Sequence, residues 1–194
     1  MSDLDKRIRR KDLIKRVVDA DQAISIIKSG MTVGLCTDVL PICEALERRA
    51  KGDRDFSINL WSASTTLKAD RTFGKLGIIK RRIGQQTMLR KFINAGEVEY
   101  IDAPLGFYYQ SIRSGEYGSL GVAIVEAIGI TEEGNLIPSY RCGDMPNFVQ
   151  AAEQVIVELN TFYPLELQGI YDIYLPQNPP LKQAIPINKV DDRI

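Results

Sequence analysis

The residues of this chain that could carry out chemistry are carboxylates, hydroxyls, lysines and cysteines, because its 194 residues include no histidine. A Ser-His-Asp triad, a Cys-His dyad and a histidine-bearing zinc site are therefore excluded within it. Its three cysteines, Cys36, Cys43 and Cys142, form no C-x-x-C pair, which favours buried thiols in a reducing compartment. We expect no metal site, and any catalysis must rely on carboxylates, hydroxyls, lysine or backbone amides.

Two glutamates, Glu126 and Glu158, close the apolar runs "AIVE" and "VIVE". Burial at such a position would perturb the pKa of the carboxyl group, which could then act as a nucleophile or a base. A carboxylate that accepts hydrogen bonds from backbone amides at a strand end is the commoner explanation. Both interpretations stay open for each residue.

Two turns could bind a ligand. The first, "SASTT" at 62–66, is a run of small and hydroxyl residues directly after a predicted strand, where hydroxyls and backbone amides can hold a carboxylate or phosphate. An ordinary turn that caps the next helix is the simpler explanation. The second, "CGDMPNF", places Gly143 and Asp144 before a helix, where they could present backbone amides to a ligand. The simpler explanation is again a cap, in which Asp144 or Asn147 is the N-cap residue.

Apolar periodicity and turn residues predict helices that alternate with strands. Helices are expected at 12–29, 41–52, 87–96, the first part of 107–118, and 148–154. Strands are expected at 31–36, 56–62, 98–104, 120–130 and 155–160, with a turn at 76–83 and a hairpin at "TEEGN". Most strands are apolar runs, which favours an α/β fold with a mainly parallel sheet flanked by helices on both faces. Ligands of such sheets bind beyond the carboxyl ends of the strands.

Composition narrows the class of protein. Hydrophobic residues make up 44% of the chain, and 25 basic residues balance 25 acidic ones, which argues against nucleic acid or an anionic membrane as a partner. No apolar run reaches the roughly twenty residues of a membrane helix, and no secretory signal is apparent. These features favour a cytoplasmic protein. We expect one α/β domain over 1–174, followed by a proline-rich extended tail or inter-domain linker over 175–194.

Several stretches in one order carry a family resemblance. They are "LIKRVVDADQAISIIKSGMTV", "RKFINAGEVEYID", "VAIVEAIGITEEGNLIPS", "QVIVELN" and "LELQGIYDIYLPQNPP" with the final "PINKVDDRI". Together they resemble the N-terminal half of the acetyl-CoA hydrolase/transferase family of class I CoA-transferases, which includes acetate, succinate, butyrate and 4-hydroxybutyrate CoA-transferases.

The resemblance implies two similar α/β domains that face each other across an active site. A glutamate attacks the acyl-CoA thioester, and the acceptor carboxylate finally takes the CoA, which is covalent catalysis by a carboxylate. In the family that glutamate lies in the C-terminal half, so we expect no catalytic residue in this chain and no turnover by it alone. The partners implied are a C-terminal half, in cis or in trans, an acyl-CoA and a short carboxylic acid. Coenzyme A would be a substrate, with no further cofactor, and a homo-oligomer is compatible with this architecture.

The resemblance also selects substrate-binding residues. Where the family has a glycine-rich loop of the type "SGFTxxGYPK", this chain has the shorter "LCTDVLPICEAL", with Thr37 and Pro41 as remnants. The family's "TGAST" turn corresponds to "SASTT", and its "GN" before a helix corresponds to a Gly-Asp pair. The substrate-binding residues expected on this basis are Thr37, Ser64, Thr65, Thr66, Gly143 and Asp144.

Two departures leave an alternative function open. The shortened first loop lacks the family's glycines, and the carboxylate of Asp144 would repel an anionic substrate by about 1 kcal/mol or more if partly buried. The chain could therefore be a degenerate binding or interaction domain with no enzymatic role. A third hypothesis, catalysis by Glu126 or Glu158 within this chain alone, is supported only by the presence of these carboxylates.

Overall fold

The chain folds around one seven-stranded sheet in the order β4-β3-β2-β1-β5-β6, with β7 also paired to β5. The structure is a computed structural model that describes residues 3–37, 39–63, 67–84, 88–170, 173–185 and 187. The strands are β1 (Thr32–Leu35), β2 (Ile58–Trp61), β3 (Ile79–Gly84), β4 (Glu99–Asp102), β5 (Leu120–Ile130), β6 (Leu136–Pro138) and β7 (Ala152–Leu159). All strand pairs are parallel except β5 with β6, which form a hairpin. The fold is thus α/β with a mainly parallel sheet, as the sequence predicts.

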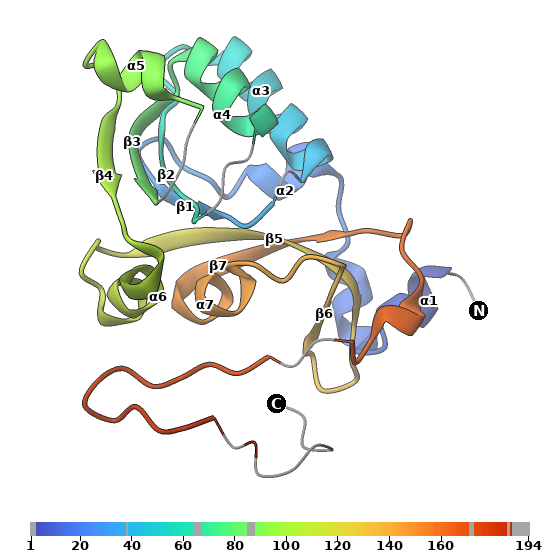
Figure 1. Cartoon of the computed structure of the whole chain (residues 1–194). Coiled ribbons are helices and arrows are strands. Elements are labelled where there is room, and N and C mark those ends of the chain that lie inside the picture. The colour runs from blue at the N-terminus through green and yellow to red at the C-terminus, as the bar shows by residue number, and fades with distance from the viewer. Residues whose placement is uncertain are drawn as a thin grey trace.

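Helices cover both faces of the sheet. They are α1 (Asp3–Arg7), α2 (Ala20–Ile24), α3 (Leu40–Gly52), α4 (Leu67–Leu76), α5 (Arg90–Asn94), α6 (Leu105–Ser114) and α7 (Met145–Ala151), with 3-10 turns η1 (Lys11–Arg16) and η2 (Leu165–Leu167). In Figure 1, α2 to α5 lie on one side of the sheet and α6 and α7 on the other. Because both faces are covered, ten of the eleven residues of β5 are buried, which explains its unbroken apolar sequence.

Alternate residues of the central strands build two cores. Val33 and Ile124 belong to the core beneath α2, α3 and α4, whereas Ala123 belongs to the core beneath α6 and α7. At Gly34 the second layer lies directly on the sheet, since a Cβ there would be 2.7 Å from the Phe148 ring of α7. Successive side chains of a strand point to opposite faces of the sheet, so the position of a residue decides which helical layer its side chain contacts.

Two predictions of local structure are wrong. The helix expected over 12–29 is broken, because the chain leaves the helical conformation after η1 and starts again at α2, where Asp19 caps the backbone N–H of Gln22 at 2.8 Å. The turn expected over 76–83 is instead largely strand β3, which pairs with both β2 and β4. The helix expected at 148–154 is present three residues earlier, as α7, and Ala152 already starts β7.

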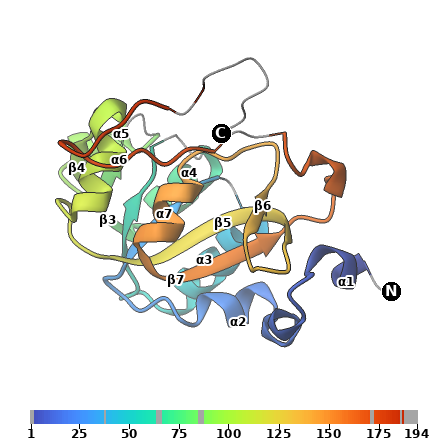
Figure 2. The same ribbon diagram turned by 90° about the horizontal axis from the view of Figure 1, so that it is seen from below.

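The segment after η2 has no helix or strand among its described residues. Figure 2 shows it as an extended chain that runs past α6 and α7. It is tied to α6 by side-chain hydrogen bonds, since Arg113 donates to Asn178 at 3.0 Å and Asn178 donates to the Gln110 carbonyl at 3.4 Å. The division at residue 174 between a domain and a linker remains a prediction.

A close backbone contact at the end of β3 gives the first testable prediction. A Cβ on Gly84 would lie 1.8 Å from the Ser62 carbonyl oxygen, and its φ of +137° is one that side chains rarely adopt. We expect Gly84→Ala to lower the free energy of unfolding by about 3 kcal/mol or more, measured by urea denaturation. Gly52→Ala at the end of α3 is the control, because nothing lies within 4 Å of its Cβ position. Equal stabilities of the two variants would contradict the contact.

Candidate functional site

The turns singled out in the sequence meet at the carboxyl edge of the sheet. Asp144 reaches the segment after β2, where the Ala63 backbone N–H donates to its carboxylate at 2.7 Å. Gly143 lies beside the end of β1, since a Cβ on it would be 3.8 Å from the Cys36 carbonyl oxygen. The loop after β1, the segment after β2 and the turn before α7 are thus neighbours, at the position where parallel sheets bind ligands.

Asp144 is a buried carboxyl group with two donors. Besides the Ala63 N–H, the Tyr109 hydroxyl of α6 donates to it at 2.8 Å, and only 2% of its surface is exposed. Burial raises the pKa of Asp144, while the two hydrogen bonds and the positive charge of Arg82 oppose that rise. Asp144 precedes α7 as its N-cap residue but makes no capping bond, so its side chain joins α6, α7 and the loop after β2 instead.

A buried ion pair, Arg82 with Asp70, holds the segment after β2. Arg82 of β3 and Asp70 of α4 are fully buried, with 3.6 Å between the Arg82 Nε and an Asp70 carboxylate oxygen. Arg82 also donates to the Ser62 carbonyl at 2.8 Å, and Asp70 accepts from the Met88 N–H at 3.0 Å. One ion pair therefore holds the chain at Ser62 and at Asp70, on either side of 64–66, which lie outside the described residues.

Thr37 follows the end of β1, where its hydroxyl is buried without a hydrogen-bond partner among the described residues. Its carbonyl accepts from the Val39 N–H at 2.9 Å, which closes a tight loop before α3. The neighbouring Cys36 points to the other face of the sheet, where burial and the carboxyl of Asp144 raise the pKa of its thiol. The Thr37 hydroxyl is thus a buried group with no partner among the described residues, whereas the pKa of the buried Cys36 thiol is raised.

The outcome for the predicted site residues is uneven. Gly143, Asp144 and the loop of Thr37 lie together, whereas Ser64, Thr65 and Thr66 lie outside the described residues. The side chain of Asp144 is directed into the protein, so its role in substrate binding stays a prediction. Asn147, the other N-cap candidate, lies inside α7 and accepts a hydrogen bond from Arg113.

Sequence reasoning missed two residues that build this edge. Nothing in the sequence distinguishes Tyr109 from a packing tyrosine, yet its hydroxyl donates to Asp144. Arg82 lies in the segment 76–83, for which the sequence predicts a turn. The β-branched Ile78, Ile79 and Ile83 around the three cations are the signal that favours a strand there.

Glu126 and Glu158 lie side by side on the opposite face from Asp144. The two residues are paired in the register of β5 and β7. Burial raises the pKa of Glu158 to about 7, a backbone hydrogen bond from Ile42 opposes the rise, and the charge of Glu126 adds to it. Glu126 accepts a hydrogen bond from the Asn160 amide at 3.1 Å.

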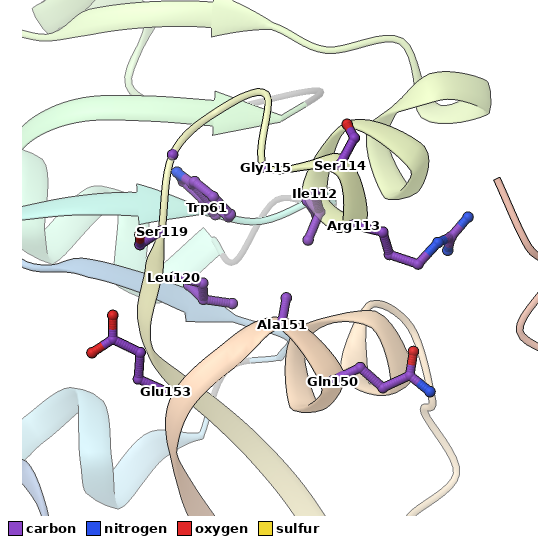
Figure 3. Close-up of a pocket in the computed structure, with 11 residues that line it drawn as sticks. Trp61, Ile112, Arg113, Ser114, Gly115, Ser119, Leu120, Gln150, Ala151 and Glu153 are labelled. Atoms are coloured by element: carbon purple, nitrogen blue, oxygen red, sulfur yellow. The ribbon is translucent and has the colours of Figure 1, made fainter.

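Two cavities flank α6. The larger, about 550 Å³, lies near the amino ends of β5 and β7, where Figure 3 shows Trp61, Ile112, Leu120 and Ala151 around it, with Arg113 and Glu153 extending to opposite sides. The smaller, about 320 Å³, adjoins the candidate site, because Cys142, Gly143 and Tyr109 line it together with the extended segment that starts at Ile173. The smaller cavity is therefore the one connected to the predicted binding residues.

Within the described ranges, no three Cys, Asp or Glu side chains are grouped so that they could hold a metal ion. In the same part of the chain, every helix is too short or too polar to cross a membrane.

The environment of Asp144 yields a pH-dependent prediction. Asn keeps the shape and can satisfy both the Ala63 N–H and the Tyr109 hydroxyl, whereas Ala leaves a buried N–H without an acceptor. We expect Asp144→Ala to lower the free energy of unfolding by about 2 kcal/mol and Asp144→Asn to lower it much less.

The sign of the pH effect follows from the raised pKa. The contribution of Asp144 to stability is full below its unfolded pKa and is lost as pH rises through the folded value. Asp144→Asn should therefore gain stability relative to the parent chain as pH rises above the ordinary aspartate pKa of about 4, measured by urea denaturation at several pH values. A stability difference that is constant with pH would show that Asp144 is not a desolvated carboxyl group.

The chain is similar in sequence to proteins of one family. The chain matches the model of the acetyl-CoA hydrolase/transferase N-terminal domain over residues 1–192. It is 40% identical over 199 residues to a succinyl-CoA:acetate CoA-transferase of Clostridium kluyveri, covering 98% of this chain and 37% of that protein. It is 31% identical over 210 residues to an acetyl-CoA hydrolase of Schizosaccharomyces pombe, covering 98% of this chain and 40% of that protein.

A solved structure supports the fold alone. The glutaconate coenzyme A-transferase of Acidaminococcus fermentans superimposes with a TM-score of 0.56 at 13% identity, over 73% of this chain and 68% of the other. The chain spans about two fifths of the length of the two sequence relatives. On the strength of the match over residues 1–192, the chain belongs to the acetyl-CoA hydrolase/transferase family and corresponds to its N-terminal domain.

Proposed function

We propose that this chain forms the N-terminal half of an acyl-CoA:carboxylate CoA-transferase or acyl-CoA hydrolase and provides one wall of its active site. The observation that carries the proposal is the convergence of the loop of Thr37, the segment at Ala63 and the turn at Gly143 on one edge of the sheet. Family membership supports the same conclusion.

In this proposal the nucleophilic glutamate comes from a C-terminal half, in the same chain or in another. Its carboxylate oxygen attacks the thioester carbonyl, and the C–S bond breaks to release CoA thiolate and leave an enzyme-bound anhydride. The thiolate then attacks the glutamyl carbonyl, which releases the acid and forms a glutamyl-CoA thioester. An acceptor carboxylate, or water in a hydrolase, completes the reaction.

The residues of this chain would bind and orient substrate rather than react. Thr37 offers a hydroxyl donor, and the turn at Gly143 offers backbone N–H groups, both suited to carbonyl or carboxylate oxygens. Ser64, Thr65 and Thr66 would add hydroxyls to the same wall. Coenzyme A is then a substrate and no further cofactor is needed. The three free cysteines support a reducing compartment such as the cytoplasm.

One observation favours a second candidate, a binding or interaction domain with no enzymatic role. Asp144 places a carboxyl group at the edge where the family resemblance implies an asparagine, and a negative charge there opposes anionic substrates. Turnover by the two halves together distinguishes the transferase or hydrolase from the binding domain.

The partner and the activity are tested together. The protein is purified gently from its native cells, and mass spectrometry identifies any C-terminal CoA-transferase half joined to it or bound to it. We expect no turnover of acetyl-CoA with succinate or acetate by the isolated 194 residues, and turnover once the C-terminal half is present. Turnover by the isolated chain that is lost in Glu126→Gln or Glu158→Gln would place the nucleophile here instead. Absence of turnover by the two halves together would favour the binding domain.

The role of Thr37 has its own test in the assembled enzyme. Thr37→Val keeps the shape of the side chain and removes the hydroxyl, so we expect about a tenfold fall in kcat/KM for acetyl-CoA, the effect of one hydrogen bond. Thr32→Val in β1 is the matched control and should leave kcat/KM unchanged. Equal kinetics of the two variants would remove Thr37 from the binding wall.

A further inference from the structure

The extended segment 173–182, called the strap from here on, closes a cavity against α6 and α7. This is the smaller of the two cavities, about 320 Å³, and its lining comes from α6, from the turn before α7, from α7 itself and from the strap. Figure 2 shows the strap running past both helices. The volume lies at the lower end of the range for small-molecule sites, roughly 300–1,000 Å³. The cavity is therefore large enough for a small ligand.

Arg113 of α6 joins three segments at this cavity, which it lines. Its guanidinium donates to the Asn147 side-chain oxygen of α7 at 2.5 Å and to the Asn178 side-chain oxygen of the strap at 3.0 Å. Asn178 in turn donates to the Gln110 carbonyl at 3.4 Å. Asn147 is only 7% exposed, so a buried polar side chain of α7 is spent on holding this arginine. The guanidinium is thus fixed from α7 and from the strap at once.

These bonds leave the positive charge of Arg113 without a counter-charge. Both acceptors are neutral carboxamide oxygens, and they use two of the five N–H donors of a guanidinium. Lys182 of the strap is exposed and lines the same cavity. Among the described residues, neither cation forms an ion pair. The two charges are therefore available to a ligand.

The described lining of the cavity contains neither aspartate nor glutamate. Asp144 accepts a hydrogen bond from Tyr109, which lines the cavity, but Asp144 itself is 2% exposed and does not belong to the lining. The amide groups of Gln110 and Asn147 add polar atoms to the two cations. Cations with neutral polar neighbours suit an oxyanion, because hydrogen bonds between charged donors and charged acceptors are the strong ones.

We propose that this cavity binds a small oxyanion, a phosphate or a carboxylate group, between Arg113 of α6 and Lys182 of the strap. Asn178 is then a positioning residue, because it anchors the strap that carries Lys182. The proposal goes beyond the proposed function, since neither cation is among the residues expected to bind acyl-CoA. Anion binding is also measured without turnover, so failure of one proposal leaves the other standing.

The site is tested by NMR on the isotope-labelled chain. Sodium phosphate and sodium acetate are titrated separately, at an ionic strength kept constant with sodium chloride. We expect the amide signals of Gly143 and Asn178 to shift and to saturate. Tighter binding of phosphate would identify a phosphate-bearing ligand, and tighter binding of acetate a carboxylate. No saturable shift with either anion would overturn the proposal.

Charge variants locate the anion. Lys182→Gln removes one exposed charge and should weaken binding about fivefold, whereas Arg113→Gln should weaken it about tenfold or more. Lys75→Gln is the matched control, because Lys75 is an exposed lysine of α4 on the other side of the sheet, and its affinity should equal that of the parent chain. Equal affinities of Lys182→Gln and Lys75→Gln would show an adventitious ion only and would overturn the site.

The role of the strap has a separate variant. Asn178→Ala keeps both cations but removes the anchor, so it should weaken binding several-fold. Unchanged affinity in Asn178→Ala would refute the positioning role. The spectrum of each variant reports whether it is folded. Lys182 is exposed and makes no hydrogen bond with the described residues, so Lys182→Gln decides the site even if Arg113→Gln fails to fold.

Discussion

The buried ion pair of Arg82 and Asp70 is the constraint on which the carboxyl edge of the sheet depends. Two fully buried charges lose their hydration, and this loss is offset only by their attraction and by hydrogen bonds to the surrounding backbone. Arg82 donates to the Ser62 carbonyl after β2 and Asp70 accepts from the Met88 N–H after β3, so the pair joins the segments that follow two neighbouring strands. Gly84 approaches the same Ser62 carbonyl so closely that a side chain at this position would clash with it.

Carboxyl groups with raised pKa values lie on both faces of the sheet. On the side of α6 and α7, Asp144 joins the segment after β2 to Tyr109. On the side of α3, Glu158 of β7 lies beside Glu126 of β5. Burial raises the pKa of both Asp144 and Glu158, so the cost of ionising each carboxyl group grows with pH.

The edge of the sheet is built from the segments that follow β1 and β2 and from the turn before α7. The Thr37 hydroxyl is buried there, and the Asp144 carboxyl group accepts hydrogen bonds from Ala63 and Tyr109. This arrangement is consistent with a half-site that binds an acyl or carboxylate oxygen while a second domain supplies the nucleophile. The smaller cavity beside Gly143 and Tyr109 is the space within this chain that adjoins the wall.

The sequence by itself determined the α/β class, the parallel strands and the family, because apolar runs and turn residues act locally and the family motifs lie in one order. It also located the turns at Thr37 and Gly143 as the places to examine. It failed at 76–83, because consecutive cations resemble a solvated turn unless the partner of Arg82 is known. It also failed at 12–29, where the cap at Asp19 outweighed the apolar periodicity.

Only the tertiary structure decided how distant residues combine. Asp144 and Tyr109 are separated by 35 positions and Asp144 and Ala63 by 81, so no local pattern could pair them. The same holds for the register that sets Glu126 beside Glu158. Burial and charge act between side chains that the sheet brings together, and this is why the candidate residues were visible in the sequence while their partners were not.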